Sequence, residues 1–284
     1  MSELTLEIAR NVAALRDHVA IWRAAGERIA LVPTMGALHD GHLSLVEAAK
    51  ARADRIIMSI FVNPTQFAPS EDFGAYPRTF VQDVAAFAAA GGDLVFAPEI
   101  AEVYPPGFAS KISLEGPATA GLEDKFRPDH FAGVATVVAK LLIMAKPDVA
   151  IFGEKDYQQL AVIRQMARDL NLEPEIAGAP TVRAKDGLAL SSRNVYLTPE
   201  ERAKAPLLHA ALERCRTAIS SGVAIEAAVA KADATLAAAG FAVDYVAARH
   251  AETLAPIGSA AEGPIRLLVA ARLGTTRLID NIAV

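Results

Sequence analysis

The sequence predicts an α/β protein, with a Rossmann-like parallel sheet in its N-terminal part and a smaller α+β part after it. In the first half, apolar runs typical of buried strands alternate with segments whose apolar residues recur at helical spacing. After about residue 181, two helical segments precede three strand-like runs with short connections rich in Gly and Pro. The length of 284 residues suggests about two domains. We therefore expect domains over residues 1–181 and 182–284.

The first elements alternate between helix and strand. Val12, Leu15, Val19 and Trp22 are spaced to lie on one face of a helix. A buried strand is expected over 28–33, followed by a turn containing Gly and a short helix that ends near residue 52. The next strand is expected over 55–62, where the run is apolar enough to be covered on both faces.

The same alternation continues to about residue 170. We expect further helices over 77–90, 131–145 and 156–170, and further strands over 93–97 and 148–152. Strands separated by helices of this length favour right-handed crossovers and a parallel sheet. Because ligands of such sheets bind at the carboxyl ends of the strands, the loops after residues 32, 62 and 152 are the places to search.

The C-terminal part has a strong helix start. Thr198 is suited to cap the helix, Pro199 fits its first position, and Glu201 completes a capping box. One helix is expected from there to about residue 221, where Gly222 ends it, and a second reaches about residue 239. Strands over 241–248, 265–273 and 276–282 are expected to form an antiparallel meander.

Composition excludes several classes of protein. Acidic residues outnumber basic ones 33 to 28, a balance that disfavours both a nucleic-acid binder and a protein held to anionic membranes by charge. The single cysteine, Cys215, cannot form an intramolecular disulfide. The start lacks the pattern of a signal peptide, and the longest apolar stretch, 131–145, is broken by Lys140. We expect a cytoplasmic protein that does not enter a membrane.

The loop after the first predicted strand, P-T-M-G-A-L-H-D-G-H over 33–42, is the first candidate for chemistry. We expect Asp40 or Ser44 to cap the next helix, which puts His42 in or just before its first turn. Exposed backbone N–H groups there favour an anion, and His39 and His42 are suited to donate further hydrogen bonds to phosphate. A zinc site is disfavoured, because no third ligand stands at the usual spacing.

The loops after the other strands carry further polar groups. Asn63 and Gln66 have amides that both donate and accept, as a small polar substrate requires, although Asn-Pro also suits a plain turn. Lys155 offers a compact charge for phosphate. Asp156 is either a functional group or a simple helix cap, and Gln159 lies one turn further along.

A later segment holds two hydroxyls and a guanidinium close together. Ser191, Ser192 and Arg193 stand in a stretch that is suited to close over a triphosphate. On these residues alone, a solvated linker is an equally good interpretation.

Taken together, the motifs resemble one family. P-T-M-G-A-L-H-x-G-H, F-V-N-P-x-Q-F, R-P-x-H-F-x-G-V-A-T-V-V, F-G-E-K-D-Y-Q-Q-L and R-A-K-D-G-L-A-L-S-S-R-N occur in order between residues 33 and 194. They resemble the pantoate–β-alanine ligase (pantothenate synthetase) family, in the nucleotidyltransferase superfamily that carries H-x-G-H. Five motifs in one order are highly specific.

The resemblance implies a reaction in two steps. The carboxylate of (R)-pantoate attacks the α-phosphorus of ATP and pyrophosphate leaves; the amine of β-alanine then attacks the enzyme-bound pantoyl adenylate, which gives pantothenate, a coenzyme A precursor, and AMP. The family uses Mg²⁺ held mainly by the ATP phosphates, and its members are typically homodimers. The first domain would bind nucleotide and pantoate, and the second would act as a lid associated with the dimer.

The resemblance also implies site residues, position by position. His42 matches the family's catalytic proton donor, and His39, Lys155 and Arg193 are expected to act with it. Gln66 matches the residue shared by pantoate and β-alanine, Gln159 a second pantoate contact, and Asn63 a support of the same pocket. The expected ATP site consists of Met35, Gly36, Ala37, Leu38, His39, Asp40, Gly41, His42, Gly153, Glu154, Lys155, Asp156, Val182, Leu190, Ser191, Ser192 and Arg193.

One departure and two alternatives accompany this interpretation. Asp129 stands where the family pattern leads us to expect Gly, so the loop at 127–131 would change shape if that position needs a positive φ. The first alternative is a related nucleotidyltransferase that passes AMP to a phosphorylated acceptor, and it does not need Gln66 and Gln159 as a pair. The second is a non-catalytic homologue, which loss of His42 or Lys155 would favour; both are present.

Overall fold

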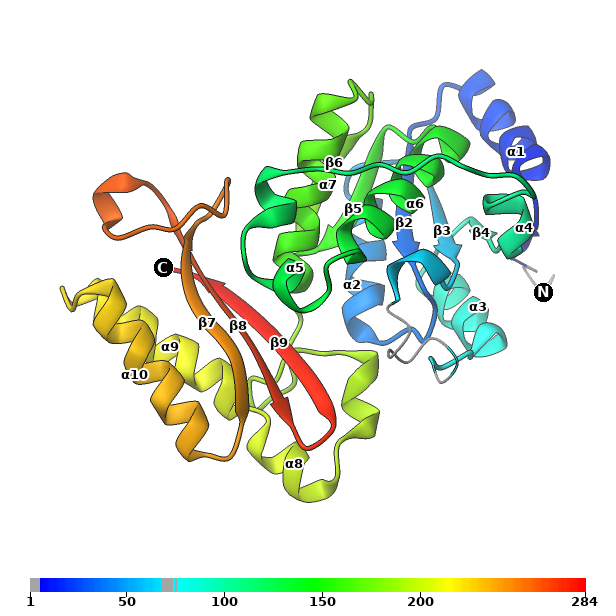
Figure 1. The fold of residues 1–284 in the computed structure, drawn as a ribbon. Coiled ribbons are helices and arrows are strands. Elements are labelled where there is room, and N and C mark those ends of the chain that lie inside the picture. The colour runs from blue at the N-terminus through cyan, green and yellow to red at the C-terminus, as the bar shows by residue number, and fades with distance from the viewer. Residues whose placement is uncertain (1–5, 68–73, 75) are drawn as a thin grey trace.

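Six parallel strands form the larger sheet of the protein (Figure 1). The structure, a computed structural model, describes residues 6–67, 74 and 76–284. In spatial order the strands are β1 (Glu7–Ala9), β4 (Leu94–Phe96), β3 (Arg55–Ile60), β2 (Ile29–Thr34), β5 (Val149–Gly153) and β6 (Glu175–Ala179). Every neighbouring pair is parallel, which confirms the predicted sheet type. The two edge strands, β1 and β6, were not among the predicted elements.

Helices cover both faces of this sheet. On one face, α1 (Val12–Ala24), α6 (His130–Ala145) and α7 (Tyr157–Asp169) pack against side chains such as Ile29 and Leu31. On the other, α2 (Asp40–Lys50) and α3 (Phe80–Ala89) pack against the alternate residues of the same strands, Ala30 and Val32 among them. Because both faces are buried, the strands consist of continuous apolar runs.

A second, antiparallel sheet lies in the C-terminal part. It consists of β7 (Ala242–His250), β8 (Ile265–Leu273) and β9 (Thr276–Ala283), in that order, as the meander prediction requires. Figure 1 shows α9 (Leu207–Ser220) and α10 (Ile225–Ala238) side by side along one face of this sheet. Their apolar side chains and the inner face of the sheet form one core, in which Cys215 is buried.

The prediction of a single helix over 198–221 is wrong, because two helices occupy that segment. The first, α8 (Pro199–Lys204), begins with the predicted Thr198–Glu201 capping box. It stops before Pro206, which lacks the N–H needed to continue the helical hydrogen bonds, and α9 begins directly after that proline. Short elements complete the chain: α4 (Ile100–Val103), α5 (Glu123–Phe126), and 3₁₀ turns η1 (Pro64–Gln66), η2 (Gly116–Thr119), η3 (Glu154–Asp156), η4 (Ser192–Tyr196) and η5 (Ala260–Glu262).

The outer face of the small sheet contacts the first part of the chain. Leu268 and Ala247 pack with Leu122 and with Ala161 of α7. Nearby, Arg277 of β9 donates to Glu123 of α5 at 2.8 Å. Apolar and ionic contacts therefore hold the small sheet against α5 and α7. No helix within residues 6–67 and 76–284 is long and apolar enough to cross a membrane.

Candidate active site

The site lies where the strand order of the large sheet reverses. β2 has β3 on one side and β5 on the other, so the connections from β2 and β5 leave in opposite directions and open a crevice at the carboxyl ends. A cavity of about 230 Å³ occupies this place. Of the predicted site residues, it is lined by Met35, His39, Gly41, His42, Asn63, Gln66, Gly153, Lys155, Asp156, Gln159, Val182, Leu190, Ser191, Ser192 and Arg193.

The two histidines build the start of α2. The N-cap is His39, not Asp40 or Ser44 as expected: its backbone is extended, whereas Asp40 is already the first helical residue. His39 Nδ1 accepts a hydrogen bond from the Gly41 backbone N–H at 3.1 Å. His42 Nδ1 accepts one from the His39 N–H at 3.3 Å. Since a backbone N–H can only donate, each neutral ring carries its proton on Nε2.

Gly41 is required for this arrangement. A Cβ at that position would lie 2.8 Å from the His39 ring, which is closer than non-bonded atoms approach. The ring centroids of His39 and His42 are 4.1 Å apart, so the two rings form a compact pair. The H-D-G-H sequence therefore fixes two neighbouring Nε2–H donors at a helix N-terminus.

Both histidines are neutral near pH 7. Burial, the neighbouring His39 ring and the charge of Lys155 lower the pKa of His42 to about 3. Burial and Lys155 also lower the pKa of His39. In the protein without ligand, the pair therefore offers hydrogen bonds rather than transferable protons.

A cationic group, Lys155, lines the same cavity as the histidines. Lys155 lies in η3, directly after β5, with its Nζ 3.6 Å from Asp156 Oδ2. Asp156 occupies the N-cap position of α7, but its side chain makes no capping hydrogen bond. Burial acts to raise the pKa of Asp156, while Lys155 and Arg193 outweigh it and hold that pKa below its usual value. Asp156 thus stays charged and orients the cations around it.

The segment 191–193 also lines the cavity. Ser191 is the N-cap of η4, and its Oγ accepts a hydrogen bond from the Arg193 backbone N–H at 3.2 Å. This turn brings Ser192 and Arg193 to the cavity wall, as the triphosphate interpretation requires.

Two amide side chains, Asn63 and Gln66, also line the cavity. Asn63 is 1% exposed, and its Nδ2 donates to Gln66 Oε1 at 3.1 Å and to the Gly133 carbonyl at 3.2 Å. Its Oδ1 accepts from Thr65 and from the Tyr104 hydroxyl at 2.8 Å. With these bonds made inside the protein, Asn63 is suited to position Gln66 rather than to bind a ligand itself.

Two residues without a predicted role also hold Gln66. His130 Nδ1 lies 2.9 Å from the Gln66 carbonyl, and Arg127 Nη2 donates to that carbonyl at 3.3 Å. Both line the cavity. The R-P-x-H-F motif contained the signal for them, although the sequence did not show what they contact. Asp129 between them has φ −94°, so this position does not need glycine.

Five predicted site residues do not line this cavity. Ala37 and Leu38 donate their backbone N–H groups to the buried Asp83 at 3.0 and 2.9 Å, which turns their loop toward α3. Glu154 contacts Arg266 of the small sheet instead. The five are Gly36, Ala37, Leu38, Asp40 and Glu154.

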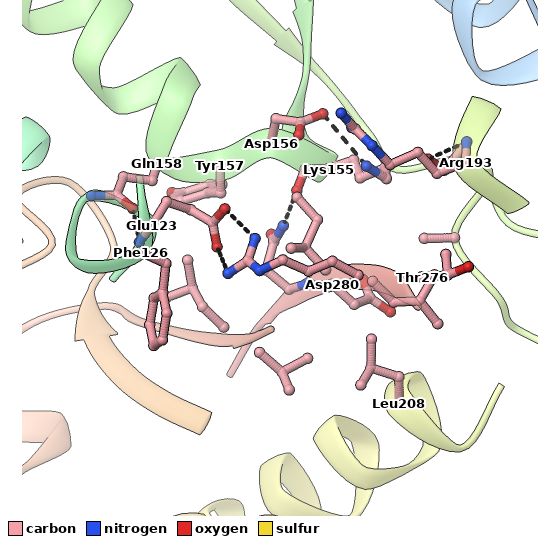
Figure 2. Close-up of a pocket in the computed structure, with 18 of the residues that line it drawn as sticks. Glu123, Phe126, Lys155, Asp156, Tyr157, Gln158, Arg193, Leu208, Thr276 and Asp280 are labelled. Carbon is pink, nitrogen blue, oxygen red and sulfur yellow. Dashed lines mark hydrogen bonds and ion pairs between the residues drawn. The ribbon is translucent and has the colours of Figure 1, made fainter. Parts of the chain in front are cut away.

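A second cavity of about 390 Å³ adjoins the first and lies against β8 and β9. In Figure 2, Lys155, Asp156 and Arg193 stand at one end of it and Glu123 and Phe126 at the other. Lys155, Asp156, Gln159 and Arg193 line both cavities, so the cationic groups are open to both. Within the described part of the chain, no cluster of three His, Cys, Asp or Glu side chains is suited to hold a metal ion.

This geometry suits an anionic ligand beside a small polar one. The two imidazoles, Lys155 and Arg193 all line one cavity, where their N–H groups are suited to bind phosphate. The Gln66 and Gln159 side chains line the neighbouring region. The arrangement can hold a polyphosphate and bring a second molecule against it.

Comparisons with known proteins agree on one family. The family model described as "Pantoate-beta-alanine ligase" matches residues 7–283. The "Pantothenate synthetase" of Rhodopseudomonas palustris (strain HaA2) is 58% identical over 277 residues, 98% of each chain. "Pantothenate synthetase 2" of Bradyrhizobium diazoefficiens is 60% identical over 277 residues, again 98% of each chain.

Solved structures agree as well. A pantothenate synthetase from Thermus thermophilus superimposes with a TM-score of 0.91 at 48% identity, covering 98% of this chain and 99% of the other. A pantoate–β-alanine ligase from Francisella tularensis, solved as a complex with "Beta-gamma ATP and Beta-alanine", gives a TM-score of 0.79 at 35% identity, with 98% and 97% covered.

Proposed function

This chain belongs to the pantoate–β-alanine ligase family, and from that premise we propose how its residues perform the ligation. The enzyme consumes ATP to join pantoate to β-alanine and forms pantothenate. A carboxylate is a poor acyl donor because its leaving group would be oxide. The family solves this by adenylation, which exchanges that leaving group for AMP.

In the first step, a pantoate carboxylate oxygen forms a bond to the α-phosphorus and the bond to pyrophosphate breaks. We assign the phosphates to the His39 and His42 Nε2–H donors, Lys155 and Arg193. Negative charge grows on the departing pyrophosphate, so donors fixed in advance bind the transition state more strongly than the ground state. No side chain needs to form a covalent bond, and positioning supplies much of the rate.

Pantoate is assigned to the region of Gln66 and Gln159. Gln66 is held through its side chain by Asn63 and through its carbonyl by His130 and Arg127. A side-chain amide whose orientation and backbone are both held can discriminate a hydroxy acid by its hydrogen bonds. In the second step, the β-alanine amine attacks the acyl carbon, AMP leaves, and the nitrogen loses a proton.

One observation carries the proposal: the imidazole pair, Lys155, Arg193 and the Gln66 amide all line a single cavity at the reversal of strand order. The test is exchange of labelled pyrophosphate into ATP. Exchange that requires pantoate but not β-alanine is expected. Exchange without pantoate would exclude pantoate as the group that receives AMP, and release of ADP and phosphate would exclude an adenylate.

Further expectations accompany this assignment. Mg²⁺ would arrive with ATP and be held mainly by phosphate oxygens and water, which fits a cavity whose lining, within the described residues, contains one carboxylate, Asp156. Activity should therefore disappear with a chelator and return with Mg²⁺. We also propose a cytoplasmic homodimer, in which residues 1–181 bind nucleotide and pantoate and residues 182–284 form the lid; light scattering of the purified protein tests the dimer.

A further inference from the structure

Asn281 connects the C-terminal sheet to the turn that carries Lys155. It stands on β9, 126 residues beyond Lys155 in the chain, and is 3% exposed. Its Nδ2 donates to the Glu154 carbonyl at 2.9 Å and to the Lys155 carbonyl at 2.8 Å. Both hydrogens of the side-chain amide are thus used on two consecutive residues of η3.

The third polar contact of Asn281 fixes its orientation. Arg266 Nε donates to Asn281 Oδ1 at 2.7 Å. A guanidinium can only donate and a backbone carbonyl can only accept, so the amide has one possible orientation. The same guanidinium donates from Nη2 to Glu154 Oε2 at 3.2 Å and lies 4.1 Å from the Tyr157 ring centre. Asn281, Arg266 and Glu154 therefore form a closed set of contacts around the turn.

We propose that Asn281 is a positioning residue, which fixes the Glu154–Lys155 backbone so that the Lys155 ammonium meets the phosphates of ATP. The lysine side chain is long and flexible, so its reach depends on where its backbone is held. An error of about 1 Å in such a group can cost about 100-fold in rate. This role of Asn281 rests on the proposed function in one respect, namely that ATP is the ligand of Lys155.

Two variants separate the hydrogen bonds from the packing. Asn281→Asp keeps the size of the side chain and the acceptor for Arg266 but loses both N–H donors. Asn281→Ala loses all three contacts. We expect both to lower kcat/KM for ATP by about 10- to 100-fold. An Asn281→Asp variant with wild-type kcat/KM would overturn the proposal.

A double-mutant cycle tests whether Asn281 acts through Lys155. In a Lys155→Ala background, Asn281→Ala should change kcat/KM for ATP, and the dissociation constant of α,β-methylene-ATP, by less than about threefold. The same loss in both backgrounds would mean that Asn281 acts elsewhere, and would overturn the proposal.

Glu123→Gln provides the matched control. Glu123 bonds to Arg277, another β9 residue, so this variant weakens a different contact between the small sheet and the first part of the chain. We expect a lower melting temperature with unchanged kcat/KM for ATP; a loss as large as that of Asn281→Ala would mean that general loosening is responsible. Failure of the wild-type protein to bind the ATP analogue would refute the proposed function. Normal binding by the wild type, together with additive effects of Asn281→Ala and Lys155→Ala, would refute only the role of Asn281.

Discussion

Replacing His42 by Gln should lower the activity far less than replacing it by Ala. His42 is the third residue of α2, and its Nδ1 accepts from the His39 N–H. Gln at this position is a standard capping-box residue, so its Oε1 can accept the same bond. Its amide N–H₂ then remains to donate toward the cavity, as the imidazole Nε2–H does.

The magnitude follows from the lowered pKa. With the pKa of His42 at about 3, about one ring in 10,000 is protonated at pH 7. Forming the imidazolium there costs about 5 kcal/mol, which the bound nucleotide would have to supply before the ring could give up a proton. Donation of a hydrogen bond carries no such cost. We therefore expect His42→Ala to lower kcat by about 10²–10³ and His42→Gln to stay within about tenfold of wild type.

The assay is AMP formation with saturating ATP, pantoate and β-alanine. His42→Glu is the control, because it keeps the cap but has no donor and repels phosphate; it should be at least as slow as His42→Ala. If His42→Gln were as slow as His42→Ala while folded and equally stable, the ring would act as a proton donor, and the reasoning from its pKa would be refuted.

Three further outcomes are expected. Gln66→Ala should raise the KM for pantoate about tenfold or more while changing that for ATP by less than about twofold, because it removes hydrogen bonds on one side of the cavity; an equal rise in both would indicate misfolding. Gly133→Ala should lower the melting temperature and raise the KM for pantoate, since the new Cβ would lie 2.2 Å from the Thr65 carbonyl oxygen beside Gln66; an unchanged melting temperature would contradict this close approach. As the pH falls from 6.5 toward 3, His42 gains a proton in the unfolded chain but not in the folded protein. The free energy of unfolding of the wild type should therefore fall more steeply than that of His42→Gln, by up to about 1.4 kcal/mol per pH unit. Parallel curves of unfolding free energy against pH, from chemical denaturation, would show that His42 titrates normally.

The periodicity of the sequence predicted the centre of the fold better than its edges. The inner strands of the large sheet are continuous apolar runs, and each was expected near its observed bounds. β1 has only three residues, and β6 contains Gly178 and an exposed Glu175, so neither produces a buried-strand pattern. The helix over 198–221 was predicted as one because its apolar spacing continues past Pro206, although the missing N–H of that proline divides it.

The site was predictable wherever its residues follow a strand, and less so where contacts cross the chain. His42, Lys155 and Gln66 all come within a few residues of a strand end and meet at the cavity. The sequence favours Asp40 or Ser44 as the cap of α2 because Asp and Ser are preferred at that position, and only the geometry shows the Nδ1 of His39 in that role. Asn281 contacts Lys155 across 126 residues, a proximity that local pattern does not reveal.

The formation of an acyl adenylate is most directly tested with ¹⁸O in the pantoate carboxylate. If the carboxylate attacks the α-phosphorus, one labelled oxygen must appear in AMP after β-alanine displaces it, with the other retained in the pantothenate amide. We predict one ¹⁸O in each AMP and none in pyrophosphate. Unlabelled AMP, or label in inorganic phosphate released with ADP, would contradict the mechanism.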